Sequence, residues 1–119
     1  MPRPAQPGVD HLRNRILDLV AASRRVAPAE LTGPGRASAG VAFARQIGMY
    51  LHHVVLGATL TAAGDAFARD RTTAAYACAR VEDRRDDVSF DFQLRCLEDA
   101  LRLACQGTGS AGRRRGSRR

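Results

Sequence analysis

Apolar residues recur along much of this chain at spacings of three and four, which place them on one face of an α-helix. Such stripes run through residues 11–25, 41–56 and 90–105. They consist of Leu12, Ile16, Leu19 and Val20, then Ile47, Leu51, Val54 and Val55, and finally Phe90, Leu94, Leu97, Leu101 and Ala104. Runs of β-branched and aromatic residues are scarce, so no segment is convincing as a strand. The pattern therefore predicts an all-α protein.

Two shorter helices are predicted between the second and third stripes. Thr59 is placed to cap a helix over residues 60–67, and Asp70 to cap another over residues 71–82, because both side chains accept hydrogen bonds from a first helical turn. A tight polar turn, Ala68-Arg69-Asp70, joins them. The second helix has an apolar face of small residues, namely Ala74, Ala77, Cys78 and Val81. Close packing of two helices across such a turn is typical of a helix-turn-helix.

Proline, glycine and serine mark the loops and the termini. Residues 1–8 hold three of the five prolines, and residues 32–40 form a loop in which Arg36 is the charged residue. Pro28 is placed to begin a short helical turn and Ser89 to cap the last helix. We predict a single helical domain of about five longer helices over residues 9–106, with a disordered lead-in at 1–8 and a disordered basic tail at 107–119.

The formal net charge is +7, and every basic residue is Arg. This usage is typical of a GC-rich genome, and the absence of lysine excludes P-loop, Schiff-base and general-base lysines. Five of the Arg lie in residues 113–119, and without them the formal charge falls to +2. The excess charge is thus concentrated in a short tail, of a kind that binds polyanions without sequence preference.

Nothing in the sequence indicates catalysis, metal binding or membrane insertion. It contains no nucleophile motif and no phosphate-cradling glycine loop, so we expect no enzyme activity, no cofactor and no small-molecule substrate. The adjacent His52 and His53 point in different directions on a helix and cannot form an i, i+4 metal pair. No apolar run approaches the ~18 residues that cross a membrane. Since the three Cys lack C-x-x-C spacing, we expect a cytoplasmic protein.

A more specific signal lies in residues 45–78. In order, these hold Arg45-Gln46-Ile47-Gly48-Met49-Tyr50-Leu51, Gly64-Asp65-Ala66-Phe67 and Arg69-Asp70-Arg71-Thr72-Thr73-Ala74-Ala75-Tyr76-Ala77-Cys78. Over residues 20–82 the chain resembles the C-terminal DNA-binding domain of the bacterial replication initiator DnaA. That family has an Arg-Gln-x-x-Met-x-Leu helix and a short helix ending in Gly-x-Ala-Phe. The turn Gly-Gly-Arg-Asp-His-Ser/Thr-Thr and then Ala-Cys follow.

The resemblance implies an all-helical domain that recognises a short asymmetric box in double-stranded DNA and is associated with the nucleoid. Residues 69–73 match the positions that enter the major groove, Arg36 matches a minor-groove contact, and Arg45 a contact to the DNA backbone. Tyr76, one turn further on, either touches the backbone or packs, and Asp70 either caps the helix or accepts from a cytosine amino group. The candidate DNA-binding residues are Arg36, Arg45, Arg69, Asp70, Arg71, Thr72, Thr73 and Tyr76.

Three further arginines, Arg80, Arg84 and Arg85, lie near the end of the predicted second helix. They either extend a positive face toward DNA phosphates or are neutralised by their acidic neighbours, which are Glu82, Asp83, Asp86 and Asp87. The sequence leaves both interpretations open.

Several positions depart from the family pattern. The turn is one residue shorter, with Ala68 in place of two glycines, Arg71 replaces a His, and the basic loop keeps a single Arg. No Walker A motif is present, so we expect a stand-alone DNA-binding domain without ATPase activity. Two functions follow: a sequence-specific DNA-binding regulator of replication initiation or transcription, or a helical interaction module that binds polyanions only through its Arg tail.

Overall fold

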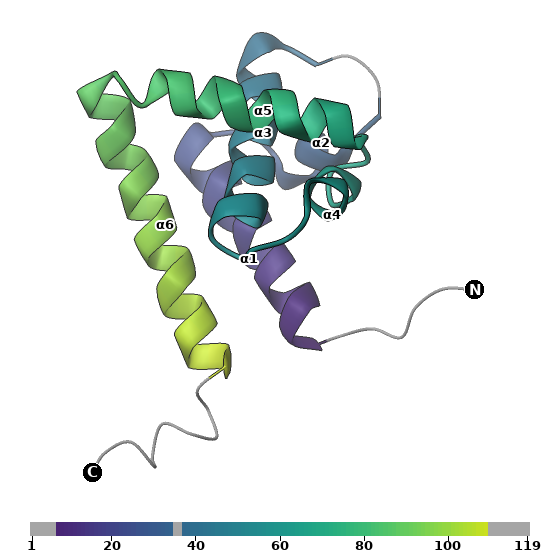
Figure 1. Cartoon of the computed structure of the whole chain (residues 1–119), viewed down its shortest axis with the longest axis vertical. Coiled ribbons are helices and arrows are strands. Elements are labelled where there is room, and N and C mark those ends of the chain that lie inside the picture. The colour runs from purple at the N-terminus through teal and green to yellow at the C-terminus, as the bar shows by residue number, and fades with distance from the viewer. Residues whose placement is uncertain (1–6, 35–36, 110–119) are drawn as a thin grey trace.

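The computed structural model of this chain describes residues 7–34 and 37–109, and all regular structure in these residues is helical. The helices are α1 (Pro7–Arg24), α2 (Pro28–Thr32), α3 (Ala39–Val54), α4 (Leu60–Asp65), α5 (Arg71–Arg84) and α6 (Val88–Gly109). The all-α prediction is confirmed. As Figure 1 shows, the first five helices gather into one cluster, and α6 leaves the end of α5 at a sharp corner.

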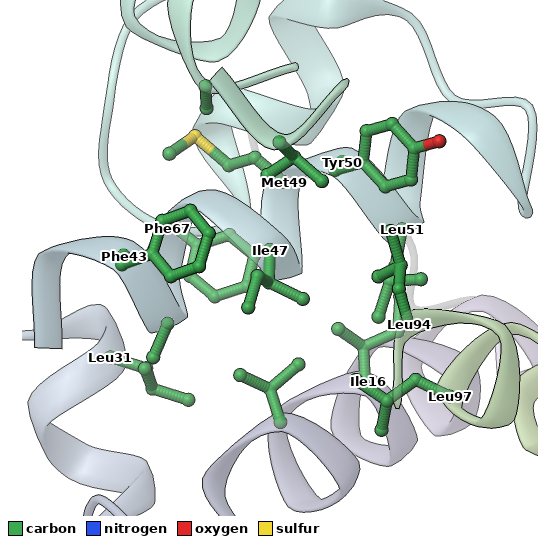
Figure 2. Close-up of a cluster of buried hydrophobic side chains, with 14 of the residues drawn as sticks. Ile16, Leu31, Phe43, Ile47, Met49, Tyr50, Leu51, Phe67, Leu94 and Leu97 are labelled. Carbon is green, nitrogen blue, oxygen red and sulfur yellow. The ribbon is translucent and has the colours of Figure 1, made fainter. Parts of the chain in front are cut away.

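Helix α3 lies at the centre of the fold and contacts α1, α2, α4 and α5. Most of its length is buried, which is expected of a helix that is apolar on nearly every side. Figure 2 shows side chains of the other helices converging on it. The largest fully buried side chains are Ile16, Val20, Leu31, Ile47, Met49, Tyr50, Leu51, Phe67, Val81, Leu94 and Leu101. Helix α6 completes this core through Phe90, Leu94, Leu97 and Leu101 and packs along α1.

Helical structure extends into both segments predicted to be disordered. Helix α1 begins at Pro7, because proline is accommodated in a first turn, where its missing N–H would have no partner. Helix α6 continues to Gly109, since glycine lowers helix propensity without forbidding a last turn. The remaining parts of those segments, 1–6 and 110–119, lie outside the described residues.

The predicted cap of the last helix is also corrected. Helix α6 begins at Val88, before Ser89, and the carboxylate of Asp87 accepts the hydrogen bond from the backbone N–H of Phe90 at 3.2 Å. Asp and Ser are both favourable caps, and the corner after α5 places Asp87 rather than Ser89 ahead of the first turn.

Candidate nucleic-acid interface

Helices α4 and α5 form the helix-turn-helix, and both predicted caps are present. Thr59 Oγ1 accepts a hydrogen bond from the Ala62 N–H at 3.0 Å, and Asp70 Oδ1 accepts one from the Thr73 N–H at 2.8 Å. Helix α4 ends at Asp65, two residues earlier than expected, so the connecting turn comprises residues 66–70. The two helices pack on each other and on α3.

Gly64 allows the turn to fold back tightly onto α4. The Arg69 N–H donates to the Gly64 carbonyl at 2.8 Å. A Cβ atom at Gly64 would lie 2.7 Å from the carbonyl oxygens of both Arg69 and Asp70, so no larger residue fits there without moving the turn. The glycine in the Gly-x-Ala-Phe motif is therefore explained by a close approach of two backbone segments.

Phe67 anchors the turn to the central helix. Its side chain is fully buried, and a Cβ at Gly48 would lie 2.3 Å from the ring. The ring also packs against His52, with centroids 5.6 Å apart and an edge-to-face orientation. Because Phe67 occupies the space that a side chain at position 48 would need, α3 sets the position of the turn.

Ala68 adopts the left-handed conformation with φ of 58°. This is the position at which the family pattern has glycine, the residue that adopts positive φ at least steric cost. The shortened turn of this chain is thus closed by an alanine in a glycine conformation.

The face of α5 opposite the core is exposed and polar. Thr72, Tyr76 and Arg80 follow each other at i, i+4 and i+8 along it, and all three are exposed. Tyr76 is 59% exposed, so it does not pack in the core. Arg71 is exposed at the start of the helix and Thr73 is half-buried, while Ala74, Ala77 and Val81 on the other face are fully buried.

Asp70 performs the capping role that was one of its two predicted roles. The backbone N–H of Thr73, which donates to its carboxylate, holds the pKa of Asp70 below its ordinary value. The carboxylate is exposed and stays ionised at neutral pH. Its oxygens accept from α5 itself, and a contact to a base stays a prediction.

Arg69 connects the turn to the loop that follows α2. Its Nη1 donates to the carbonyls of Phe67 at 3.0 Å and Ala68 at 3.1 Å, and its Nη2 donates to the carbonyl of Gly33 at 3.4 Å. The side chain is only half exposed. The structure therefore brings the turn next to residue 33, close in sequence to Arg36, which itself lies outside the described residues.

Arg45 lies in the interior, which the sequence did not indicate. It is 7% exposed, and its Nε and Nη2 donate to the carbonyls of Leu31 and Glu30 at 2.8 and 2.9 Å. A guanidinium is well suited to the free carbonyls near a helix C-terminus, and here it fastens α2 to α3. Burial, and secondarily the charge of Arg69, lowers the pKa of Arg45, and it also borders a surface hollow beside Ser38 at the start of α3.

The two arginines at the end of α5 do not form a free positive face. The guanidinium of Arg84 lies over the rings of Phe43 and Phe90, at 4.8 and 5.4 Å from their centroids. Arg85 is paired with Asp91 and Glu98 of α6. Arg85 is therefore neutralised, but by carboxylates from the next helix rather than by the acids adjacent in sequence.

The described residues contain no group of three or more His, Cys, Asp or Glu side chains suited to a metal ion. None of the described helices combines the length and apolar character needed to span a bilayer. The exposed side chains on this surface carry hydroxyl, guanidinium and carboxylate groups, and they stand on a packed pair of helices.

Comparison with known proteins agrees with this geometry. Residues 14–81 match the family described as bacterial dnaA protein helix-turn-helix. The chain is similar to the chromosomal replication initiator protein DnaA of Lactococcus lactis subsp. cremoris (strain MG1363) and of Lactococcus lactis subsp. lactis (strain IL1403), each 42% identical over 71 residues. The similarity covers 59% of this chain but 15% of either relative, so the chain corresponds to a small part of their length.

The matched residues include all of α3 and α4, the turn with Gly64 and Phe67, and most of α5. The match thus spans more than half of the chain, with both capped helix starts and the turn between the helices. The chain belongs to the bacterial DnaA helix-turn-helix family.

Proposed function

We propose that this protein binds double-stranded DNA sequence-specifically through α4, the turn and α5, and thereby regulates replication initiation or transcription without ATPase activity. The observation that carries the proposal is the first part of α5, where Arg71, Thr72 and Tyr76 are exposed on a helix whose other face is buried. A capped helix supported in this way matches the docking mode in which the N-terminal residues of a recognition helix reach base edges in the major groove.

The side chains on this surface suit direct recognition of bases and phosphates. The guanidinium of Arg71 can donate to both guanine O6 and N7, and the hydroxyls of Thr72 and Thr73 can contact a base edge or a phosphate. Tyr76 and Arg80, one and two turns along the exposed face from Thr72, are proposed to contact the DNA backbone. Because Tyr76 and Arg80 are four residues apart on one face of α5, both contacts would lie along the same groove of the DNA.

In this proposal Arg69 and Arg45 act first through protein carbonyls. Arg69 holds the turn beside Gly33, and Arg45 holds the end of α2, so together they fix the end of α2 and residue 33 relative to α5. We propose that Arg36 reaches the minor groove from that loop, and that Arg45 presents any remaining donor to a phosphate. The protein would act on the chromosome in the cytoplasm, with DNA rather than a small molecule as its partner.

The test is fluorescence anisotropy with duplexes that carry an initiator-type box or a scrambled version of it, measured over a salt series. Full-length protein is compared with a form that ends at Gly112. A preference for the box that survives removal of the tail supports the proposal. Equal affinity for both duplexes, lost together with the tail, would instead identify a polyanion-binding interaction module.

Variants in the first turn of α5 sharpen this test. Thr73→Ala should lower box discrimination, and Arg71→Gln should weaken box binding by about 1–3 kcal/mol, or roughly 5- to 150-fold, because a bidentate base contact is lost. Arg102→Gln on α6 is the matched control, since it removes the same charge from an exposed residue outside the helix-turn-helix. Equal losses for Arg71→Gln and Arg102→Gln would show that only overall charge matters.

A further inference from the structure

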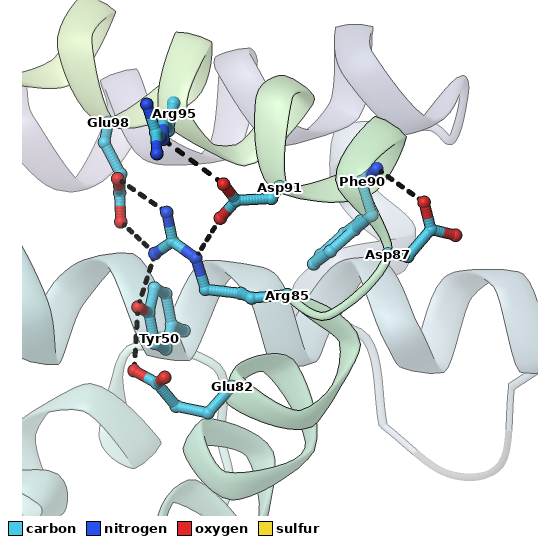
Figure 3. A network of polar contacts seen from close by, with 8 residues as sticks. All are labelled: Tyr50, Glu82, Arg85, Asp87, Phe90, Asp91, Arg95 and Glu98. Carbon is cyan, nitrogen blue, oxygen red and sulfur yellow. Dashed lines mark hydrogen bonds and ion pairs between the residues drawn. The ribbon is translucent and has the colours of Figure 1, made fainter.

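A cluster of polar side chains joins the far end of α5 to α3 and α6 (Figure 3). Arg85 directly follows α5, and its Nε pairs with the carboxylate of Asp91. Its Nη1 and Nη2 donate to the two carboxylate oxygens of Glu98 at 2.9 and 3.4 Å. Nη1 also donates to the Tyr50 hydroxyl at 2.8 Å, and that hydroxyl in turn donates to Glu82 at 3.0 Å.

Apart from Glu82, which is exposed, the members of this cluster are largely withdrawn from solvent. Glu98 is 6% and Tyr50 2% exposed, and the side chain of Arg85 is 21% exposed. A carboxylate that is buried to this extent is strongly destabilising if its cationic partner is removed. The two-pronged contact between a guanidinium and a carboxylate is also directional, so it restricts the angle between the elements that carry it.

The cluster lies where α5 and α6 make little direct contact with each other. Figure 1 shows α5 and α6 diverging from the corner that joins them, so little packing along their lengths holds the two axes. Tyr50 belongs to the central helix, and Asp91 and Glu98 belong to α6, which packs on α1. Arg85 therefore ties the end of α5 to the main body of the fold from two sides.

Helix α5 is thus held at both ends. Its beginning is held by the turn, through Gly64 and Phe67, and its end is held by Arg85. The helix has 14 residues and is about 21 Å long at 1.5 Å per residue. A shift of the Arg85 end therefore tilts α5 about the turn and changes the direction in which its first turn, which carries Thr72, is presented.

We infer that Arg85 is a positioning residue for DNA recognition: held by Glu98 and Asp91 of α6, it sets the direction in which α5 presents its first turn. The inference rests on the proposed function. Helix α6, which lies beyond the residues that match the family, is then part of the recognition apparatus without facing the DNA. Arg85 itself contacts no phosphate, because two carboxylates and a hydroxyl occupy its donors.

The decisive variant is Glu98→Gln. An effect of charge alone would raise its affinity for DNA, whereas a loss of positioning would lower its preference for the box. Removing a negative charge strengthens DNA binding if electrostatics alone matters. If the cluster positions α5, the same variant lowers the ratio of box affinity to scrambled-duplex affinity by about fivefold, as expected when a coupled network is broken. Asp99→Asn is the matched control, since it makes the same charge change at the adjacent residue, which is 76% exposed.

Tyr50→Phe provides a second, uncharged variant in case Glu98→Gln does not fold. It removes only the hydroxyl that connects Arg85 to Glu82, and it is expected to lower the affinity ratio in the same direction. In both variants the dependence of scrambled-duplex affinity on salt should match that of the unmodified protein, because no phosphate contact is lost. An unchanged affinity ratio in folded Tyr50→Phe and Glu98→Gln would overturn the inference.

A measurement without DNA separates this inference from the proposed function. Residual dipolar couplings of backbone amides report the direction of α5 relative to α3. We expect the α5 couplings to change in Tyr50→Phe or Glu98→Gln and to stay unchanged in Asp99→Asn. If the unmodified protein shows no box preference, the proposed function fails, whereas an α5 direction that is insensitive to these variants refutes the positioning role.

Discussion

Among single residues, His52 is the least expected member of the core. It is 6% exposed, and its Nε2 has no hydrogen-bond partner among the described residues. Burial, together with the charge of Arg13, lowers the pKa of His52 to about 4. The imidazole is therefore neutral in the folded protein at neutral pH and serves as a flat packing partner for Phe67.

This gives the first prediction, on the pH dependence of stability. The unfolded chain binds a proton at His52 near pH 6.5, whereas the folded chain does so near pH 4. Stability is thus complete above pH 6.5 and is lost as pH falls, by roughly 2–3 kcal/mol between pH 7 and pH 4.5. Urea unfolding at these two pH values measures the loss. His52→Phe should remove most of it and His11→Gln should not; an unchanged loss in His52→Phe would contradict the assignment.

Ala68 gives a second prediction at this scale. Because its φ of 58° favours glycine, Ala68→Gly should raise the free energy of unfolding by about 1 kcal/mol. Ala79→Gly, at an exposed position within α5, should lower it by about the same amount. Thermal or urea unfolding of both variants checks that the first change stabilises the fold and the second destabilises it. Destabilisation by both changes would show that no strain is stored at position 68.

At the scale of elements, the fold depends on how the helix-turn-helix is seated on α3. The contact is made by Phe67 over Gly48, with Gly64 admitting the backbone of the turn. Because Gly48 and Gly64 have no side chain, the Phe67 ring can lie against α3 and the backbone of the turn can lie against α4. The exposed face of α5 is consequently oriented by an apolar contact on its other side.

Gly48→Ala tests this seating. A methyl group there overlaps the Phe67 ring, so we expect a loss of about 2 kcal/mol of stability from overpacking. Gly40→Ala in the first turn of the same helix, where no atom lies closer than 4.0 Å, should be neutral or slightly stabilising. Adding Phe67→Leu to Gly48→Ala should recover part of the loss, since the two sites share one space. Additive losses would mean that the ring and the methyl group do not meet.

At the scale of the whole molecule, charge is divided between a nearly balanced body and a basic tail. The formal charge is +7, of which the five Arg of residues 113–119 supply the larger part. Within the body, Arg85 and Arg84 are engaged by α6 carboxylates and aromatic rings. Arg71 and Arg80, which are exposed on α5, are the arginines for which we propose specific contacts, whereas the tail is expected to add affinity for any DNA.

Removal of residues 113–119 should therefore weaken binding to box and scrambled duplexes by the same factor. The slope of log affinity against log salt should become shallower by up to about 4.5, because each lost phosphate contact contributes about 0.9. The ratio of the two affinities should not change. Anisotropy titrations of both duplexes at several salt concentrations measure slope and ratio together, and a ratio that collapses would place the specificity in the tail.

The helices and the two caps of the helix-turn-helix were determined by the sequence itself, because periodicity and capping depend on residues three or four positions apart. The places of Arg45, Arg69 and Arg85 were decided only by the tertiary structure. Arg45 and Arg69 were predicted to contact DNA, and for Arg85 the sequence left open a phosphate contact or neutralisation by nearby acids. In the structure each of the three donates to carbonyls or carboxylates from another element. A guanidinium binds whichever acceptor comes within about 3 Å. For Arg45 and Glu30, Arg69 and Gly33, or Arg85 and Glu98, that proximity arises only once α2, α3, α5 and α6 have packed.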